Sequence, residues 1–345
     1  MKQNPNNEKT TGSAIYSLPH SQTFYEVKGE VSRIGPEEIF EESGFVFAPY
    51  DIGDLPILRI SGHPKTVDIS GRTFHVSTDC PYDGTPVTQA DYRQLFEKSM
   101  DSIRSGELEK LVLSIRQVEE RGFTNIGDFL KRLRGAYPQA FIYLFYIPEK
   151  ECWIGASPEL LLDTQYPFQR TVALAGTMQN GAAIADWRAK EREEQRLVEV
   201  FLDEVFKGRP YRKEGPAPVE AGPVYHLVTS YFLQIESTPV NPTEIHPSPA
   251  LSGAPREKAV LLTQEIELHR RRYYTGFLGP VWGRGHSRFF INLRCLEVFA
   301  EDVALYAGGG LTADSDSEIE WMEIQHKLST LRSRFHKGGK NNGIR

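Results

Sequence analysis

Hydrophobic and polar residues recur along the chain with two periods, one typical of helices and one typical of strands. Apolar residues return every three or four positions after Thr88, a potential helix N-cap, and again within residues 126–136, 187–206 and 317–335. Each of these stretches predicts an amphipathic helix. Residues 110–118 alternate with period two, and apolar runs predict further strands near residues 140–147, 151–155, 159–163, 169–174, 277–282, 288–299 and 302–307.

The order of these elements predicts the fold class and the extent of the domain. Single helices among runs of adjacent strands favour an α+β fold with antiparallel sheets over a doubly wound parallel sheet. The polar ends, residues 1–12 and 337–345, predict disordered tails around one domain at 13–336. The periodic pattern of apolar residues is weak in residues 13–85 and clear in residues 86–336. The proline-rich stretches 208–223 and 238–256 predict loops inside this domain.

Composition narrows the classes of function. The chain has 345 residues and a net charge of −6 without a basic block, which argues against a nucleic-acid partner. Its longest apolar run, residues 140–147, is far shorter than the roughly 20 residues that span a bilayer. The three cysteines form no CxxC motif, and the first dozen residues do not resemble a signal peptide. We therefore expect a cytoplasmic protein that does not bind membranes.

Acidic side chains extend the apolar stripes of the last two predicted helices. Glu194 lies one turn before the stripe within residues 187–206, and Glu320 and Glu323 lie along one edge of the stripe within residues 317–335. Carboxylates three residues apart repel each other unless a cation lies near, and hard oxygen ligands favour Mg²⁺. Ordinary pairings explain the same residues without a metal: Glu194 with Lys190, Ser317 with Glu320 as a capping box, and Glu323 with Lys327.

Four further features can carry chemistry. The glycines at 308–310 precede the last predicted helix, and their exposed backbone N–H groups could bind an anion. A flexible turn between a strand and a helix would show the same glycines. In the predicted strand 288–299, Arg294 points to the opposite face from its apolar neighbours. Its guanidinium could bind the carboxylate of a ligand, or it could form a structural ion pair within the protein. Lys110 opens a strand and could be a general base if it is desolvated, and Glu159 at the start of another strand could be a general acid. Plain surface charges would look the same.

Taken in order, these residues resemble the chorismate-utilising family, which comprises isochorismate, salicylate, anthranilate and aminodeoxychorismate synthases. The similarity covers most of residues 90–335 and is most specific where motifs combine. The matching stretches are EKLVLSIR (109–116), FIYLFYI and WIGASPELLL (within 141–162), ALAGT (173–177), KEREEQRLV (190–198), PVYHLVT (223–229), HPSPALSGAPRE (246–257), GFLGPVW (276–282), FFINLRC (289–295) and LYAGGGLTADSDSEIEWMEIQHKL (305–328).

The resemblance implies a fold, a cofactor and a set of site residues. The fold would be that of anthranilate synthase, with two large antiparallel sheets packed together, helices outside and the active site in a cleft between the layers. Glu194 and Glu323 would hold Mg²⁺, with Glu320 close by. Lys110 would be the base and Glu159 the acid. The substrate-binding residues would be Gly176, Thr177, His226, Leu251, Arg294, Tyr306, Gly308, Gly310 and Lys327.

The motifs also bear on the subtype. Lys110 matches the lysine that activates water in the isochorismate and salicylate branches, and Ala175 stands where aminodeoxychorismate synthases often carry a nucleophilic lysine. Leu251 within HPSPALSG is more similar to isochorismate synthases than to salicylate synthases. One departure concerns the family's frequent VVLSR, because here Ile115 stands at the arginine position and Arg116 follows.

The expected activity is that of an isochorismate synthase, which adds water at ring carbon C2 of chorismate and expels the C4 hydroxyl. Such a product feeds menaquinone or siderophore biosynthesis, and we expect a monomer without a glutaminase subunit. Salicylate synthase, an ammonia-using anthranilate or aminodeoxychorismate synthase, and a catalytically silent chorismate-binding homologue remain open alternatives. A generic Mg²⁺-dependent hydrolase would explain the acidic pairs but not Lys110, Arg294 and the glycines as one set.

Overall fold

The computed structural model describes residues 10–82, 84–178, 183, 187–221, 224–236 and 238–335. The predicted tails therefore lie largely outside the described residues. The first strand begins at Thr11, so residues 11 and 12, which we expected in the tail, belong to the sheet. No helix in the described ranges is long and apolar enough to cross a bilayer.

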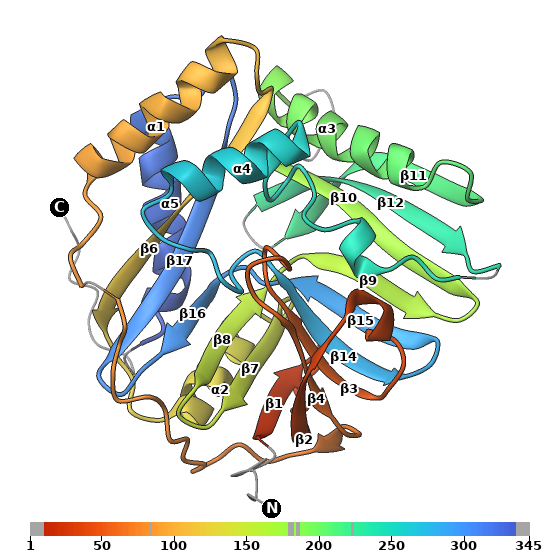
Figure 1. The fold of residues 1–345 in the computed structure, drawn as a ribbon, viewed down its shortest axis with the longest axis vertical. Helices are drawn as coiled ribbons and strands as arrows, with labels where there is room; N and C mark the ends of the chain where they lie inside the picture. Colours follow the sequence, from red (N-terminus) through yellow and green to blue (C-terminus); the bar gives the residue numbers. More distant parts are fainter. Residues whose placement is uncertain are drawn as a thin grey trace, which may run out of the picture.

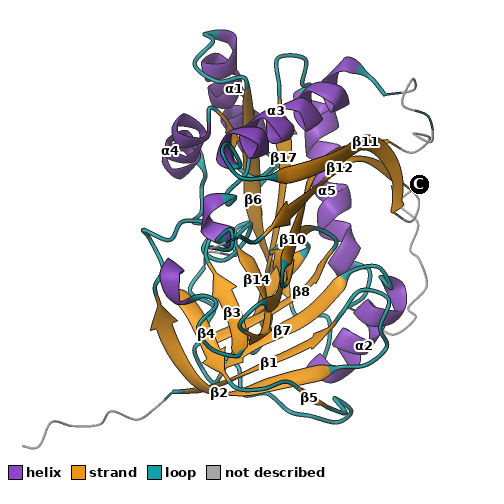
Figure 2. Cartoon of the chain, turned by 90° about the vertical axis from the view of Figure 1, so that its right-hand side faces the viewer, coloured by secondary structure: helices purple, strands orange, loops and turns teal. Residues whose placement is uncertain are grey.

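Strands dominate the described part of the chain, and helices stand singly between them (Figures 1 and 2). The strands are β1 (Thr11–Ser17), β2 (Tyr25–Ile34), β3 (Gly44–Ala48), β4 (Ile57–Ser61), β5 (Lys65–Thr66), β6 (Lys110–Glu120), β7 (Phe141–Ile147), β8 (Glu151–Ser157), β9 (Leu160–Gln165), β10 (Phe168–Met178), β11 (Tyr211–Ala221), β12 (Val224–Gln234), β13 (Gly253–Ala254), β14 (Phe277–Gly283), β15 (His286–Ile291), β16 (Cys295–Val298) and β17 (Asp302–Leu311). The helices are α1 (Gln89–Arg104), α2 (Ile126–Ala136), α3 (Ala189–Val205), α4 (Arg256–Ile266) and α5 (Ser317–Arg332), with short 3-10 turns at Pro36–Glu38 and Pro242–Glu244.

The expected α+β class with antiparallel strands is confirmed, but the expected pair of separate sheets is wrong. The described strands form one hydrogen-bonded network of 17 strands, and its described pairings are antiparallel. The reason is β2, which pairs with β1 over residues 25–30 and then with β4 over residues 31–34. One long strand thus continues from one half of the sheet into the other, and the two halves face each other as layers.

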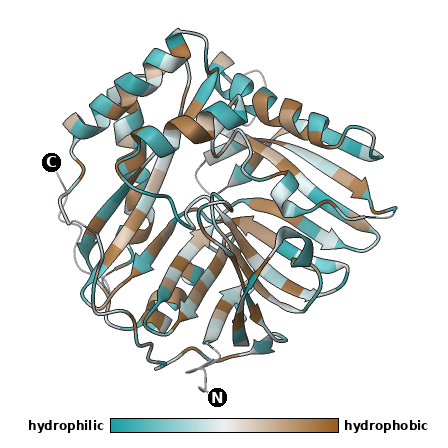
Figure 3. Ribbon diagram, in the orientation of Figure 1, coloured by the Kyte–Doolittle hydropathy of each residue, from teal (hydrophilic) through white to brown (hydrophobic). Residues whose placement is uncertain are grey.

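Three apolar clusters hold the layers and helices together. One lies between the layers, and it includes Phe47, Tyr143 and Trp153. A second lies between the first layer, which contains β6, β7 and β17, and helices α1, α2, α4 and α5. The third lies between the second layer, which contains β9, β10 and β12, and helix α3. Figure 3 shows apolar residues along the strands and mixed hydropathy along the covering helices, as expected for amphipathic helices.

Strand β7 shows how the pattern of apolar residues follows from this layering. Its odd residues Phe141, Tyr143 and Phe145 enter the cluster between the layers, and its even residues Ile142 and Leu144 enter the cluster under the helices. Both faces of the strand are buried, which is why its sequence is apolar throughout and does not alternate.

Two predicted loops contain regular structure. Within residues 208–223, β11 pairs with β12 as an edge strand. Its Pro216 and Pro218 are tolerated there, because an edge strand can lack an N–H group on its open side. Within residues 238–256, the chain is mostly irregular but includes the short strand β13, and α4 begins at Arg256.

Candidate functional site

Lys110 lies where β6, β17 and α3 come together. It is the first residue of β6, and its side chain is only 3% exposed. Gly310 on β17 makes room for it, because a Cβ added there would lie 2.9 Å from Lys110 Cε. The Glu194 carboxylate on α3 reaches the same place, with Oε2 3.6 Å from Lys110 Nζ. Lys110, Gly310 and Glu194 therefore lie next to one another, as a shared site would require.

Glu159 lies in the short connection between β8 and β9. Its backbone carbonyl accepts a hydrogen bond from Ile291 N at 3.0 Å, which ties the connection to the end of β15. Burial raises the pKa of its carboxyl to about 7, and the charges of Lys110 and Arg294 limit the rise. Among the described residues, no side chain donates a hydrogen bond to this carboxyl. A carboxyl that is half protonated near neutrality and free of donors can serve as a general acid.

Arg294 is close to these groups, but its predicted place on a continuous strand is wrong. The predicted strand 288–299 is interrupted, because the buried Asn292 side chain donates to Tyr273 O and accepts from the Tyr143 hydroxyl. Arg294 follows in a bend with φ 49°, a left-handed conformation that is uncommon for a residue with a side chain. Within the described ranges, its guanidinium makes no hydrogen bond or ion pair, and burial lowers its pKa. A partly buried cation without a bound acid suits an anionic ligand.

Gly176 and His226 connect two strands of the second layer near these charges. Gly176 on β10 has φ 71°, and a Cβ there would come within 2.8 Å of Glu191 Cβ. His226 on β12 lies with Nδ1 2.9 Å from Gly176 O. Burial lowers the pKa of His226, and the charges of Arg294 and Lys327 lower it further. Thr177 belongs to β10, but its side chain lies outside the described residues.

Lys327 and Glu323 on α5 approach the glycines of β17. Lys327 Nζ donates to Gly308 O at 2.8 Å and lies 2.6 Å from Glu323 Oε1, so the expected pair of Glu323 and Lys327 forms. The Glu323 side chain is 48% exposed. Burial raises its pKa, but the charges of Lys327, Lys190 and Arg294 outweigh burial and lower the pKa overall.

Glu320 does not belong to the capping box expected at the start of α5. The N-cap is Asp316, whose side chain accepts from Glu318 N and Ile319 N. Glu320 is 2% exposed and accepts from Ser315 Oγ at 2.8 Å and from Lys190 Nζ at 2.7 Å. Lys190 therefore pairs with Glu320 and not with Glu194, which was the expected partner.

The three predicted metal ligands are of a suitable donor type, but their side chains point toward lysines and do not converge on one point. Glu194, Glu320 and Glu323 are carboxylates, which suit a hard divalent cation. Within the described residues, no group of three acidic, histidine or cysteine side chains is close enough to hold one. Each carboxylate instead faces an ammonium group, Lys110, Lys190 or Lys327. The ammonium groups are stand-in cations, so the chemistry of the donor set fits a metal.

Two predicted substrate-binding residues lie in the apolar clusters. Leu251 is buried in the cluster under α3, and Tyr306 stacks between Trp153 and Tyr274 in the cluster between the layers. Their contacts with a ligand stay predictions. Conversely, the motif around Glu194 contains two residues that we did not single out as site residues: Lys190 and the buried Glu191, which faces Gly176. A helical projection from Glu194 back by one turn would have indicated Glu191.

The structure explains the departure at Ile115. Ile115 is buried in the cluster under the helices, on the opposite face of β6 from Lys110. Arg116 lies on the Lys110 face, further along the strand, with its guanidinium 3.7 Å from the centre of the Tyr82 ring. The isoleucine at position 115, where the family often has arginine, therefore affects packing against the helices. It does not change the face of β6 that carries Lys110.

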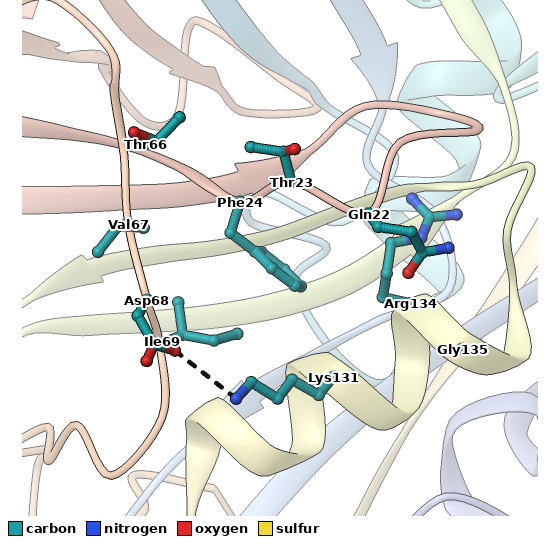
Figure 4. Close-up of a pocket in the computed structure, with 10 residues that line it drawn as sticks. All are labelled: Gln22, Thr23, Phe24, Thr66, Val67, Asp68, Ile69, Lys131, Arg134 and Gly135. Carbon is teal, nitrogen blue, oxygen red and sulfur yellow. Dashed lines mark ion pairs between the residues drawn. The ribbon is translucent and has the colours of Figure 1, made fainter.

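A cavity of about 530 Å³ lies elsewhere, between residues 22–24, residues 66–69 and α2 (Figure 4). Lys131 on its rim pairs with Asp68 at 3.7 Å. Arg134 in its wall donates to the carbonyls of Leu18, Tyr137 and Ala140, so this arginine fastens the end of α2. The lining contains none of the predicted site residues, and we do not assign the chemistry to this cavity.

Comparison with known proteins agrees with the geometry. The family model described as chorismate binding enzyme matches residues 72–336. Isochorismate synthase EntC of Escherichia coli K12 is 26% identical over 263 residues, which cover 72% of this chain and 67% of that protein. Anthranilate synthase component 1 of Streptomyces coelicolor is 28% identical over 290 residues, which cover 78% of this chain and 56% of that protein.

The fold is shared with solved structures of such enzymes. MenF, the menaquinone-specific isochorismate synthase of Escherichia coli, matches with a TM-score of 0.77 at 20% identity, over 96% of this chain and 90% of that chain. The family match covers most of the chain and includes the described residues around Lys110. The chain therefore belongs to the family of chorismate-binding enzymes.

Proposed function

We propose that this chorismate-utilising enzyme is an isochorismate synthase. The observation that carries the proposal is a buried lysine, Lys110, whose charge acts on the carboxyl of Glu159. The pKa of that carboxyl is raised to about 7, and Arg294 is its other charged neighbour. Addition of water at one ring carbon and loss of a hydroxyl at another need one base and one acid. The two groups supply both.

In the reaction that we propose, one water molecule adds to chorismate and the C4 hydroxyl leaves as another water molecule. Lys110, neutral in the reacting complex, takes a proton from water as the water oxygen bonds to C2 of chorismate. The ring double bonds shift, the bond from C4 to its hydroxyl breaks, and Glu159 protonates the departing oxygen. Glu194 Oε2 lies 3.6 Å from Lys110 Nζ, which directs the end of the lysine side chain toward α3.

Chorismate carries two carboxylates, and the cations near the acid and base suit them. Arg294 has a guanidinium with no bound acid among the described side chains, and its fork matches a carboxylate. Lys327 holds the backbone of Gly308, next to the glycines that allow a ligand to approach β17 closely. We assign these groups to substrate binding and orientation, which bring the reacting atoms together.

We propose Mg²⁺ as the cofactor, held by Glu194 and Glu323 with Glu320 close by. When bound, the ion would supply positive charge that neutralises and orients a substrate carboxylate. The protein's own contribution is to bring carboxylates from α3 and α5 toward the same end of β17.

Water as the nucleophile separates this proposal from the ammonia-using enzymes of the family, and the products can be distinguished. Purified protein is incubated with chorismate and Mg²⁺, with and without ammonium, and the products are separated by chromatography. We expect isochorismate without ammonium, in a mixture that stops short of full conversion and is not formed with EDTA. Salicylate with pyruvate would assign the chain to the salicylate branch, and a product that requires ammonium would assign it to an amino-transferring branch. No product at all would favour a silent homologue.

A further inference from the structure

Among the three lysines that contact these carboxylates, Lys190 has the fewest contacts apart from its carboxylate partner. Lys110 is packed into β6 against Gly310, and Lys327 also holds the carbonyl of Gly308. The Lys190 side chain is 26% exposed, and within the described ranges its only side-chain hydrogen bond goes to Glu320, at 2.7 Å. The charges of Glu194 and Glu323 also act on its ammonium group. Lys190 thus contacts Glu320 directly and also feels the negative charge of the two other carboxylates.

The position of Lys190 in its helix is otherwise unfavourable. It lies in the first turn of α3, where the helix dipole presents positive charge and repels a cation. The N-cap Arg188 contributes no capping hydrogen bond from its side chain. The carboxylates, above all the buried Glu320, are therefore what keeps the ammonium group in place.

We infer that Lys190 takes the place of the divalent cation in the empty enzyme, and that its ammonium must leave Glu320 before a divalent ion binds, so that Lys190 sets the affinity for that ion. The inference rests on the proposed function, because it takes the three carboxylates to be the metal ligands. Two cations cannot share the same carboxylate oxygens at close range without strong repulsion. A lysine in this position keeps Glu320 neutralised until the ion arrives, at the expense of the ion's affinity.

The test is the binding of Mn²⁺ alone, measured by the paramagnetic resonance signal of free Mn²⁺, in wild type, Lys190→Met and Lys213→Met. Lys213 is a matched control, because it is 30% exposed, pairs with Glu199 and Asp203, and lies on β11 away from the three carboxylates. We expect Lys190→Met to bind Mn²⁺ about tenfold more tightly or better. Lys213→Met should stay within about twofold of wild type, because its lost charge is remote and screened.

Thermal unfolding guards against a variant that is unstable without the ion. In Lys190→Met, Ser315 is the one side chain of the described residues that still donates to Glu320, so the ion-free variant should melt earlier and gain more from added Mn²⁺ than wild type does. Unchanged or weaker Mn²⁺ binding, together with an unchanged or smaller gain in melting temperature, would overturn the inference. Failure of the proposed function is distinguishable, because it shows in the chorismate products and not in Mn²⁺ binding.

Discussion

Two clusters of charged side chains differ in how their partners are bound. In the site, lysines on β6, α3 and α5 each contact one carboxylate, at 2.6 to 3.6 Å. In the other cluster, the Arg272 guanidinium binds Glu297, Glu151 and the Tyr82 hydroxyl together, at 2.5, 2.6 and 2.9 Å. The arginine cluster ties β8 and β16 to the chain before β14.

The comparison shows that a shifted pKa does not by itself identify a reactive group. Burial raises the pKa of both Glu159 and Glu297 to about 7. Glu297 is nevertheless held by Arg272 and by the Tyr82 hydroxyl at 2.6 Å, so its oxygens are already used. Glu159 has no such donor among the described residues, and it is the carboxyl that can exchange a proton with a ligand. Free hydrogen-bonding capacity separates the reactive group from the structural one.

The largest effect should come from Lys110→Ala. We expect kcat to fall about 1,000-fold, because a general base contributes about 10²- to 10⁴-fold. Chorismate binding, measured by calorimetry, should persist, because the carboxylate-binding cations remain. Substantial turnover in this variant would remove Lys110 from the role of base.

Arg272→Met should act on stability and not on chemistry. We expect the free energy of unfolding in urea to fall by about 3 kcal/mol, because the buried Glu297 loses its counter-ion. The loss should be larger at pH 8 than at pH 6, because ionised Glu297 is the uncompensated form. The double variant Arg272→Met/Glu297→Gln should recover part of the loss. A large drop in kcat with normal stability would mean that this cluster belongs to the active site.

Glu159→Gln should lower kcat about 100-fold, and pH should reveal the reason. In wild type, we expect kcat/KM to decline above about pH 7, where the acid loses its proton. Stability has a related signature: because the folded pKa is raised from 4.5 to about 7, the folded state binds more protons in that window and wild type loses stability as pH rises through it.

The glutamine variant lacks that contribution, so its stability relative to wild type should rise by about 2 to 3 kcal/mol between pH 4.5 and pH 7 and above. Glu297 contributes equally to both proteins and cancels in the difference. Parallel stability curves for the two proteins would contradict the raised pKa of Glu159.

Periodicity predicted the local elements well. Helix α2 spans the predicted residues 126–136, because its apolar stripe and its Asn125 cap are both local in sequence. The edge strand β11 was missed because its prolines indicate a loop, and only its pairing with β12 makes it a strand. The continuity of the two layers through β2 depends on which strands pair, and that information is not local.

The grouping of the predicted site residues could be expected better than their pairings. Lys110, Glu194 and Gly310 lie together and Lys327 binds the Gly308 carbonyl, while their roles in a site stay predictions. The conformation of Arg294 depends on Asn292, whose side chain bonds to two distant segments. The pairing of Lys190 with Glu320 joins two helices that are far apart in sequence, and no helical periodicity indicates it.

The most direct test of the central claim, that Lys110 and Glu159 direct water to C2 of chorismate, is the reaction in water labelled with heavy oxygen, followed by mass spectrometry of the isochorismate formed early. The account predicts that the isochorismate carries one heavy oxygen, located at C2, while the remaining chorismate is still unlabelled. Isochorismate without the label would show that the original hydroxyl had migrated, and it would contradict the account.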